Sequence, residues 1–144
     1  MDQKDQEILE ELMLNGKARI SRISKKLALP MSTVHHRIMK MEQTGIIKRY
    51  SAVPDYRKVG LPVSAYLLIN VEYAGKFSQE DVAREVRKLP NVLEVNIVSG
   101  DIDMIARVRG KDVEDLSKTV IERVRNIKGV AKTITSFVMK EIES

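Results

Sequence analysis

Four polar residues recur at helical spacing in the first half of the chain: Thr33, His36, Arg37 and Lys40. Residues at i, i+3, i+4 and i+7 share one face of an α-helix, so these side chains form a single stripe. Each can donate a hydrogen bond to a base edge or a phosphate, and arginine can bind guanine through two parallel bonds. The stripe predicts DNA contact, although every surface helix also has a solvated polar face. Three polar residues flank it: Ser32, His35 and Gln43.

The stripe requires a helix that buries its opposite side. Val34, Ile38 and Met41 supply that side, and the pattern predicts a helix from about Met31 to Thr44, ended by Gly45. A residue before proline avoids the helical region, so Leu29-Pro30 predicts a break immediately before this helix.

Two shorter helices are predicted before that break. The first carries Ile8, Leu9, Leu12 and Met13 on its apolar side and is closed by Asn15-Gly16. In the second, Ser21 is the predicted N-cap and the inward residues are Ile23 and Leu27. Three short helices with a sharp turn before the third describe a helix-turn-helix, whose third helix enters the major groove. Residues 46–53 are predicted to form a short strand, or wing.

Positive charge is concentrated in the first part of the chain. Residues 1–60 hold 12 Lys and Arg against 7 Asp and Glu, whereas residues 61–144 hold 13 of each, so the first part carries the whole net charge of +5. Such a concentration indicates a polyanionic partner, although basic surfaces are also common on soluble proteins. The predicted phosphate contacts are Lys17, Arg19, Arg22, Lys25, Lys26, Lys48 and Arg49.

The second half changes to the alternation expected of strands. Residues 54–62 have turn residues at both ends and are interpreted as a linker between a domain at 1–53 and a domain at 63–144. The predicted order after the linker is β-α-β-β-α-β, the ferredoxin-like motif, which makes the fold class α+β. Its strands carry Val63 to Val71, then Leu93, Val95 and Ile97, then Met104 to Val108, and finally Val130 to Met139; its helices begin near Ser78 and Asp112.

Several classes of function lack the residues they need. The chain has no cysteine, and its two histidines, His35 and His36, are adjacent and point about 100° apart on a helix, so no metal site and no cofactor is predicted. No phosphate-binding glycine motif and no His–carboxylate dyad is present, so no catalytic residue is assigned and no enzyme is predicted. The acidic N-terminus does not have the pattern of a signal peptide, and the longest apolar stretch is too short to span a bilayer. A soluble cytoplasmic protein without a membrane partner is expected.

The motifs, taken in order, resemble the Lrp/AsnC family, the feast/famine transcriptional regulators. The resemblance covers essentially the whole chain, and it rests on the combined order and spacing of the motifs. They are the stretches Asp5 to Leu9, Ala18 to Ser24, Ser32 to Ile38, Gly45 to Tyr50 and Ser99 to Asp103.

The resemblance implies a DNA-binding regulator with a separate domain for ligand sensing and assembly. It implies homodimers that assemble to tetramers or octamers, bind roughly palindromic operators near promoters, and respond to an amino acid or a related metabolite. The effector would lie beside the loop Gly100-Asp101-Ile102-Asp103, where a carboxylate could accept from an ammonium group, and near Thr133 and Thr135. Read by itself, this loop is also ordinary hairpin chemistry.

Two residues depart from the family pattern. Pro30 stands where the family commonly has a capping serine, and Ile102 stands where an aromatic residue is frequent.

Two other functions are compatible with parts of this pattern. One is an architectural DNA-binding protein without an effector, which needs the same basic head. The other is an enzyme similar to the siroheme decarboxylases, which share this two-part architecture, but here the second half has no histidine.

Overall fold

The computed structural model describes residues 1–73, 75 and 77–143 of the chain. The chain divides into two compact units, Met1–Val53 and Pro54–Ser144. The predicted linker, residues 54–62, therefore belongs to the second compact unit. None of the described helices is both long and apolar enough to cross a membrane.

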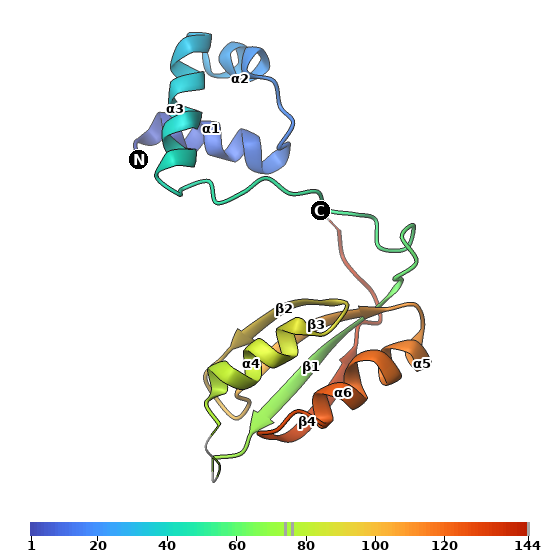
Figure 1. Ribbon diagram of the computed structural model, residues 1–144. Coiled ribbons are helices and arrows are strands. Elements are labelled where there is room, and N and C mark those ends of the chain that lie inside the picture. The colour runs from blue at the N-terminus through green and yellow to red at the C-terminus, as the bar shows by residue number, and fades with distance from the viewer. Residues whose placement is uncertain (74, 76, 144) are drawn as a thin grey trace. The chain divides into compact units, whose positions relative to one another are not determined.

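The first unit is built from three helices (Figure 1): α1, Gln3–Leu14; α2, Ile20–Leu27; and α3, Met31–Gln43. Their buried sides meet in one small core, which includes the predicted inner side of α3 and is completed by one isoleucine from each of the other helices. The predicted three-helix head is confirmed. Its core residues are Ile8, Ile23, Val34, Ile38 and Met41.

The sharp turn between α2 and α3 forms where the sequence predicts it. The helix α2 ends at Ala28, which adopts a left-handed conformation with φ of 52°, and α3 begins after Pro30. The Ser24 hydroxyl donates a hydrogen bond to the Leu29 carbonyl and so satisfies a backbone acceptor inside the turn. The proline replaces the family's capping serine without preventing the helix, because its fixed φ suits a helix start.

Three details of the first unit differ from prediction. The cap of α2 is Arg19 rather than Ser21, because Ile20 packs against the core and extends the helix backward. Met13 is 78% exposed, so the apolar side of α1 ends earlier than predicted. Residues 46–53 form no strand; Ile47 packs on the core instead, and no neighbouring strand in this unit offers a ladder.

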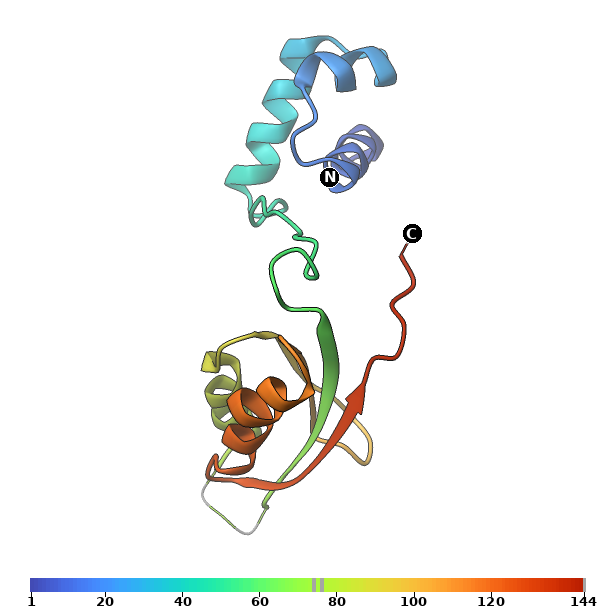
Figure 2. The ribbon, with the colours of Figure 1, turned by 90° about the vertical axis from the view of Figure 1, so that its right-hand side faces the viewer.

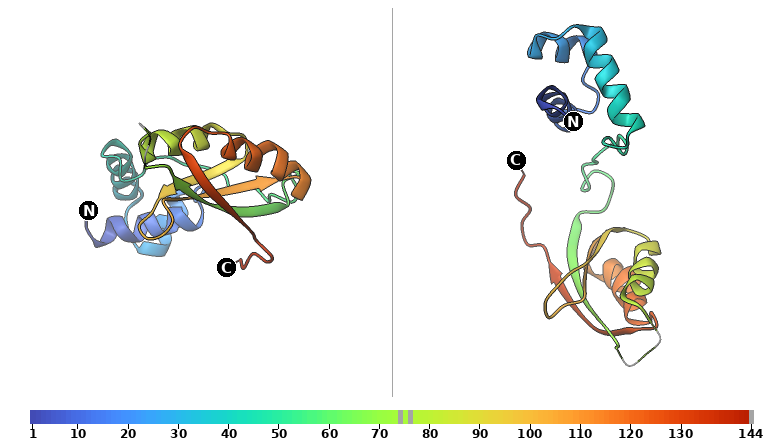
Figure 3. Two further views of the ribbon diagram at one scale, coloured as in Figure 1. Left: turned by 90° about the horizontal axis from the view of Figure 1, so that it is seen from below. Right: turned by 90° about the vertical axis from the view of Figure 1, so that its left-hand side faces the viewer.

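The second unit is a four-stranded antiparallel sheet with helices on one face (Figures 1 and 3). Its strand order is β2-β3-β1-β4, which confirms the ferredoxin-like prediction. Helix starts at Ser78 and Asp112 are also confirmed, since each side chain accepts from a backbone N–H of the first turn. The elements are β1, Val63–Val71; α4, Gln79–Lys88; β2, Val92–Ile97; β3, Met104–Gly110; α5, Val113–Leu116; a π-helical turn, Ser117–Ile121; α6, Glu122–Arg125; and β4, Val130–Phe137.

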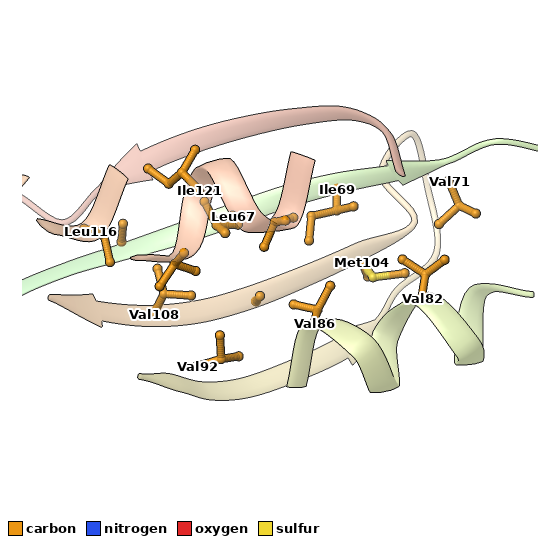
Figure 4. Packing of buried hydrophobic residues seen from close by; sticks show 14 residues of the cluster. Leu67, Ile69, Val71, Val82, Val86, Val92, Met104, Val108, Leu116 and Ile121 are labelled. Atoms are coloured by element: carbon orange, nitrogen blue, oxygen red, sulfur yellow. The ribbon is translucent and has the colours of Figure 1, made fainter. Parts of the chain in front are cut away.

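The core of the second unit lies between the helices and the covered face of the sheet (Figure 4). Alternate residues of the central strand β1, such as Leu67 and Ile69, are fully buried there beside Val86 of α4 and Met104 of β3. The predicted alternation of β1 and β3 is confirmed, because a sheet covered on one face buries every second side chain.

Two irregularities change which residues enter this core. A register shift between Val92 and Glu94 makes Val92 the buried residue of β2. Ile97 pairs with the buried Met104 but lies at the end of this edge strand and is 43% exposed, against prediction. The last helix, predicted as continuous, contains a π turn, which brings Ile121 inward beside Val120. The final strand ends at Phe137 rather than Met139.

Truncation of a buried side chain should destabilise the protein more than truncation of an exposed one. Leu67→Ala is expected to lower the free energy of unfolding of the second unit by about 2–5 kcal/mol, because it removes packed methyl groups and leaves a cavity. Ile97→Ala, at the exposed position of β2, should cost less than about 1 kcal/mol. Chemical denaturation of both variants measures the difference, and equal losses would contradict the exposed position of Ile97.

Candidate nucleic-acid interface

The predicted polar stripe lies on the outward side of α3. Ser32, His35, His36, Lys40 and Gln43 are exposed, whereas Thr33 and Arg37 are half-buried where α3 meets the start of α1. The stripe residues Thr33, His36, Arg37 and Lys40 line a common shallow concavity with Met1, Asp2 and Asp5. The structure therefore brings the four predicted residues together, and it adds two carboxylates beside them.

Arg37 is held by two aspartates at the start of α1. Its Nη1 lies 2.7 Å from the Asp2 carboxylate and 2.9 Å from that of Asp5. The same aspartates form a capping box, in which each carboxylate accepts from the backbone N–H of the other residue. One guanidinium thus joins the first turn of α1 to the middle of α3. The sequence carried a signal for this contact in the Asp2–Asp5 spacing, but we did not predict the pairing.

These contacts change the protonation of the acids. The hydrogen bond from Arg37, assisted by the backbone N–H of Asp5, lowers the pKa of Asp2 to about 2. The same pairs raise the pKa of Arg37 above its usual value. Both groups are therefore charged at any physiological pH. The two carboxylates partly cancel the positive charge of α3 beside Arg37, whereas Lys40 adds positive charge to the same concavity.

The predicted phosphate contacts are distributed around this surface. Arg19 and Arg22, at the start of α2, are exposed, and so are Lys17, Lys25, Lys48 and Arg49. Lys26 differs from these, because its ammonium pairs with Glu11 of α1 and so has a partner within the unit.

A tyrosine anchors the chain that follows α3. The Tyr50 hydroxyl donates to the Glu42 carboxylate at 2.7 Å, and burial together with this hydrogen bond raises the pKa of Tyr50 to about 12. The contact ties the segment that carries Lys48 and Arg49 back to the end of α3, in place of the predicted strand.

The predicted effector loop is organised by a buried aspartate. Asp103 is only 7% exposed, and its carboxylate accepts from the Val71 N–H at 2.7 Å, from the Gln79 amide at 3.0 Å and from the Tyr73 hydroxyl. These donors lower the pKa of Asp103, with the hydrogen bond from Tyr73 as the largest cause. A carboxylate with this many internal donors serves to position the loop. Neither Tyr73 nor Gln79 was predicted.

The other predicted effector residues lie at the same end of the sheet. Gly100 and Asp101 are exposed, Gly100 has φ of 106°, and Ile102 is half-buried. Thr133 pairs with Ile69 in the register of β4 and β1, and Ile69 pairs in turn with Met104, the residue after the loop. Thr133 accepts a hydrogen bond from Arg125, whereas Thr135 lies two residues farther along β4, opposite Leu67.

The comparisons with known proteins agree over both units. Residues 1–48 match the family model for winged helix-turn-helix DNA-binding domains, and residues 64–144 match the model of the Lrp/AsnC ligand binding domain. The chain belongs to the Lrp/AsnC family. It is a DNA-binding transcriptional regulator of that family, as the helix-turn-helix and its basic surface predict.

The similarity to named relatives and to solved structures extends over nearly the whole chain. An HTH-type transcriptional regulator of Pyrococcus furiosus is 41% identical over 140 residues, which are 96% of this chain and 93% of the relative. The regulator FL11 of Pyrococcus horikoshii is 36% identical over 97% of this chain and 90% of its own length. A Neisseria meningitidis transcriptional regulator in complex with L-methionine superposes with a TM-score of 0.92 at 30% identity, and the match covers 100% of this chain and 93% of the other.

The two histidines predicted to lie side by side on α3 do so. The rings of His35 and His36 are 5.8 Å apart and tilted by 58°, and no described group of three His, Cys, Asp or Glu residues could hold a metal ion.

The Asp2–Arg37 pair predicts a stability change in acid. The folded-state pKa of Asp2 lies below its usual value, so its contribution is complete above about pH 4 and is lost as the pH falls toward 2. Asp2→Asn should therefore lower the melting temperature of the first unit at pH 5, and the difference from wild type should shrink as the pH approaches 2.

Thermal unfolding followed by circular dichroism between pH 5 and pH 2 tests this expectation. Glu10→Gln is the matched control, because its carboxylate lies on the same helix and accepts from the neutral Gln6 amide. A difference between Asp2→Asn and wild type that stays constant over the whole pH range would contradict the assigned role of the pair.

Proposed function

We propose that α3 reads an operator in the major groove of DNA with its exposed polar side. The observation that carries this proposal is the polar stripe of α3, whose opposite side is buried in the core, so that the hydrogen-bonding side chains of the stripe face outward. Arg19, Arg22, Lys48 and Arg49 would contact phosphates and fix the register of the helix. The base-contacting set comprises Ser32, Thr33, His35, His36, Arg37, Lys40 and Gln43.

Arg37 has a specific place in this proposal. Its three hydrogen bonds within the described chain all come from Nη1, which leaves Nη2 and Nε to face a guanine. Asp2 and Asp5 would then act as supports that hold the guanidinium in one orientation. A guanidinium held in this way loses less side-chain entropy on binding and discriminates better between bases.

Two sets of substitutions test the supported arginine. Arg37→Ala should weaken operator binding by about 1–3 kcal/mol and relax sequence preference, because a bidentate base contact is lost. The combination Asp2→Asn with Asp5→Asn should also relax sequence preference, but it should leave binding to unrelated DNA equal or tighter, because two negative charges are removed near the duplex. Fluorescence anisotropy with operator and scrambled duplexes over a range of salt concentrations measures both quantities.

A control variant distinguishes a loss of base recognition from a general effect of removing charge on α1. Glu10→Gln removes a charge from α1 away from Arg37 and should leave the ratio of operator to scrambled affinity unchanged. An unchanged ratio in both the arginine and the aspartate variants would remove Arg37 from the reading set. If the wild-type protein did not bind duplex DNA even in dilute buffer, the proposed interface itself would be wrong.

We further propose that an amino acid or related metabolite binds beside the loop 100–103. The similar Neisseria regulator was solved with L-methionine, and in this chain Asp101 is exposed in the loop 100–103. The Asp101 carboxylate could accept from the ligand ammonium, and backbone N–H groups near Gly100 could bind the ligand carboxylate. Asp103, Ile102, Thr133 and Thr135 would shape the site from its sides.

Assembly is the third part of the proposal. The face of the sheet away from the helices carries Tyr66 and Ile134, which are 41% and 44% exposed, and also Leu68 of β1, which pairs with Ile134. A second copy of the chain on this face would bury these side chains and place two heads on one palindromic operator. Such homodimers would assemble further to tetramers or octamers. We infer no enzymatic activity, since both histidines belong to α3.

Two aspartates of the loop should respond differently to substitution. Asp101→Ala should abolish or blunt the heat of binding of an amino acid in calorimetry and leave operator affinity without effector unchanged. Asp103→Asn should instead lower the melting temperature of the second unit, because the buried carboxylate loses its charge and its strong hydrogen bonds. If Asp101→Ala bound the amino acid with the same dose–response as wild type, the assignment of Asp101 would be wrong. If the wild-type protein showed no saturable heat of binding, an architectural DNA-binding protein would be favoured.

A further inference from the structure

An arginine is almost completely buried at one end of the sheet in the second unit. The side chain of Arg109, on β3, is only 3% exposed, and in the sheet register Arg109 lies directly opposite Ser64 of β1. A buried guanidinium stays charged, so it must be compensated by hydrogen bonds and by an opposite charge. The partners of Arg109 are therefore informative.

Two of these partners lie in residues 54–62, the segment that leads from the DNA-binding unit to the sheet. Arg109 Nη1 donates to the Leu61 carbonyl at 3.2 Å, and the guanidinium stacks over the Tyr56 ring, 4.1 Å from its centroid. The segment between them is folded back on itself, because the Leu61 N–H donates to the Tyr56 carbonyl at 2.8 Å and Gly60 has φ of 80°. Arg109 thus contacts both ends of a closed turn.

The compensating charge comes from the other end of the chain. Glu141 follows β4, and its carboxylate accepts from Arg109 Nη2 and lies 3.5 Å from Arg107 Nη2. The last strand ends where β1 begins, so the C-terminal segment and residues 54–62 leave the same end of the sheet (Figure 2). One guanidinium joins the segment, the sheet and the C-terminal residues.

The side chains around Arg109 offer fewer hydrogen-bond acceptors than the buried donors need. Within the described chain, the Nε atoms of Arg107 and Arg109 and the Ser64 hydroxyl are buried without hydrogen-bond partners. Two guanidinium groups share one carboxylate, so loss of Glu141 would leave Arg109 buried without a compensating charge. The attachment of residues 54–62 therefore depends on a residue near the C-terminus.

We propose that Arg109 is a clamp that fixes residues 54–62 to the sheet, and that Glu141 keeps this clamp closed. Arg109 would be a positioning residue for the DNA-binding unit, because the clamp sets the point at which the tether to that unit begins. This role rests on the proposed function, in which a dimer places two heads on one operator. With the clamp open, residues 54–62 would join the tether, and the effective concentration of the second head would fall.

Proteolysis tests the clamp without DNA. Arg57 and Lys58 lie in the turn, and trypsin can cleave there only when the turn opens. Cleavage after these two residues, followed by mass spectrometry, should be about tenfold faster in Arg109→Met and in Glu141→Gln than in wild type, because a charge-assisted hydrogen bond is lost. Arg84→Met is the matched control, since Arg84 is an exposed arginine of the same unit with only surface ion pairs.

A second variant covers the case in which Arg109→Met does not fold. Tyr56→Leu removes only the ring that stacks on the guanidinium and leaves the buried ion pair intact, and it should also accelerate cleavage at the turn. Cleavage in Tyr56→Leu and Glu141→Gln at the rate of Arg84→Met would overturn the clamp.

Operator binding tests the positioning role. Duplexes with one or two half-sites should show that Arg109→Met binds a single half-site like wild type. The gain from the second half-site should fall about threefold, because residues 54–62 would lengthen the tether. Equal losses on both duplexes, or none on either, would overturn the positioning role. If wild type gained nothing from a second half-site, the proposed dimer would be wrong, while proteolysis would still decide whether the clamp exists.

Discussion

A four-stranded antiparallel sheet has two faces, and in this protein the helices cover only one of them. The central strand β1 sends Leu67 and Ile69 into the core beneath the helices and Tyr66 and Leu68 to the other side. That division assigns a role to most side chains of the sheet. Those on the covered face stabilise the fold, and those on the other face are available for the proposed assembly. The same reasoning holds for α3, whose buried side leaves its polar side as the surface that can meet DNA.

The two charged groups buried in the second unit tie together segments that are distant in the sequence. Asp103 joins the loop before β3 to the end of β1 and the start of α4, and Arg109 joins residues 54–62 to the C-terminal segment. Breaking such a pair costs more than its formation contributes, because the remaining group stays buried and unpaired. These contacts therefore serve to set the positions of loops next to proposed functional sites.

In the proposed interface, Arg37 would combine a structural role in the first unit with DNA recognition. Its Nη1 holds the start of α1 through Asp2 and Asp5, and Lys40 lines the same concavity. Its neighbours would then fix the orientation of the guanidinium before DNA binds, just as a neighbouring residue orients a catalytic group before the substrate binds. Affinity and specificity at this surface would then depend on residues that contact no base.

Local pattern in the sequence was enough for the element order, the helix-turn-helix, the inner sides of β1 and α3, and the helix starts at Ser78 and Asp112, because periodicity and capping are properties of neighbouring residues. Only the tertiary structure decided the partners of Arg37, Asp103 and Arg109, since each pairs with groups more than twenty residues away. The same is true of the register shift that buries Val92 and of the missing strand at 46–53. Both depend on which strand, if any, lies alongside, and no local pattern records that.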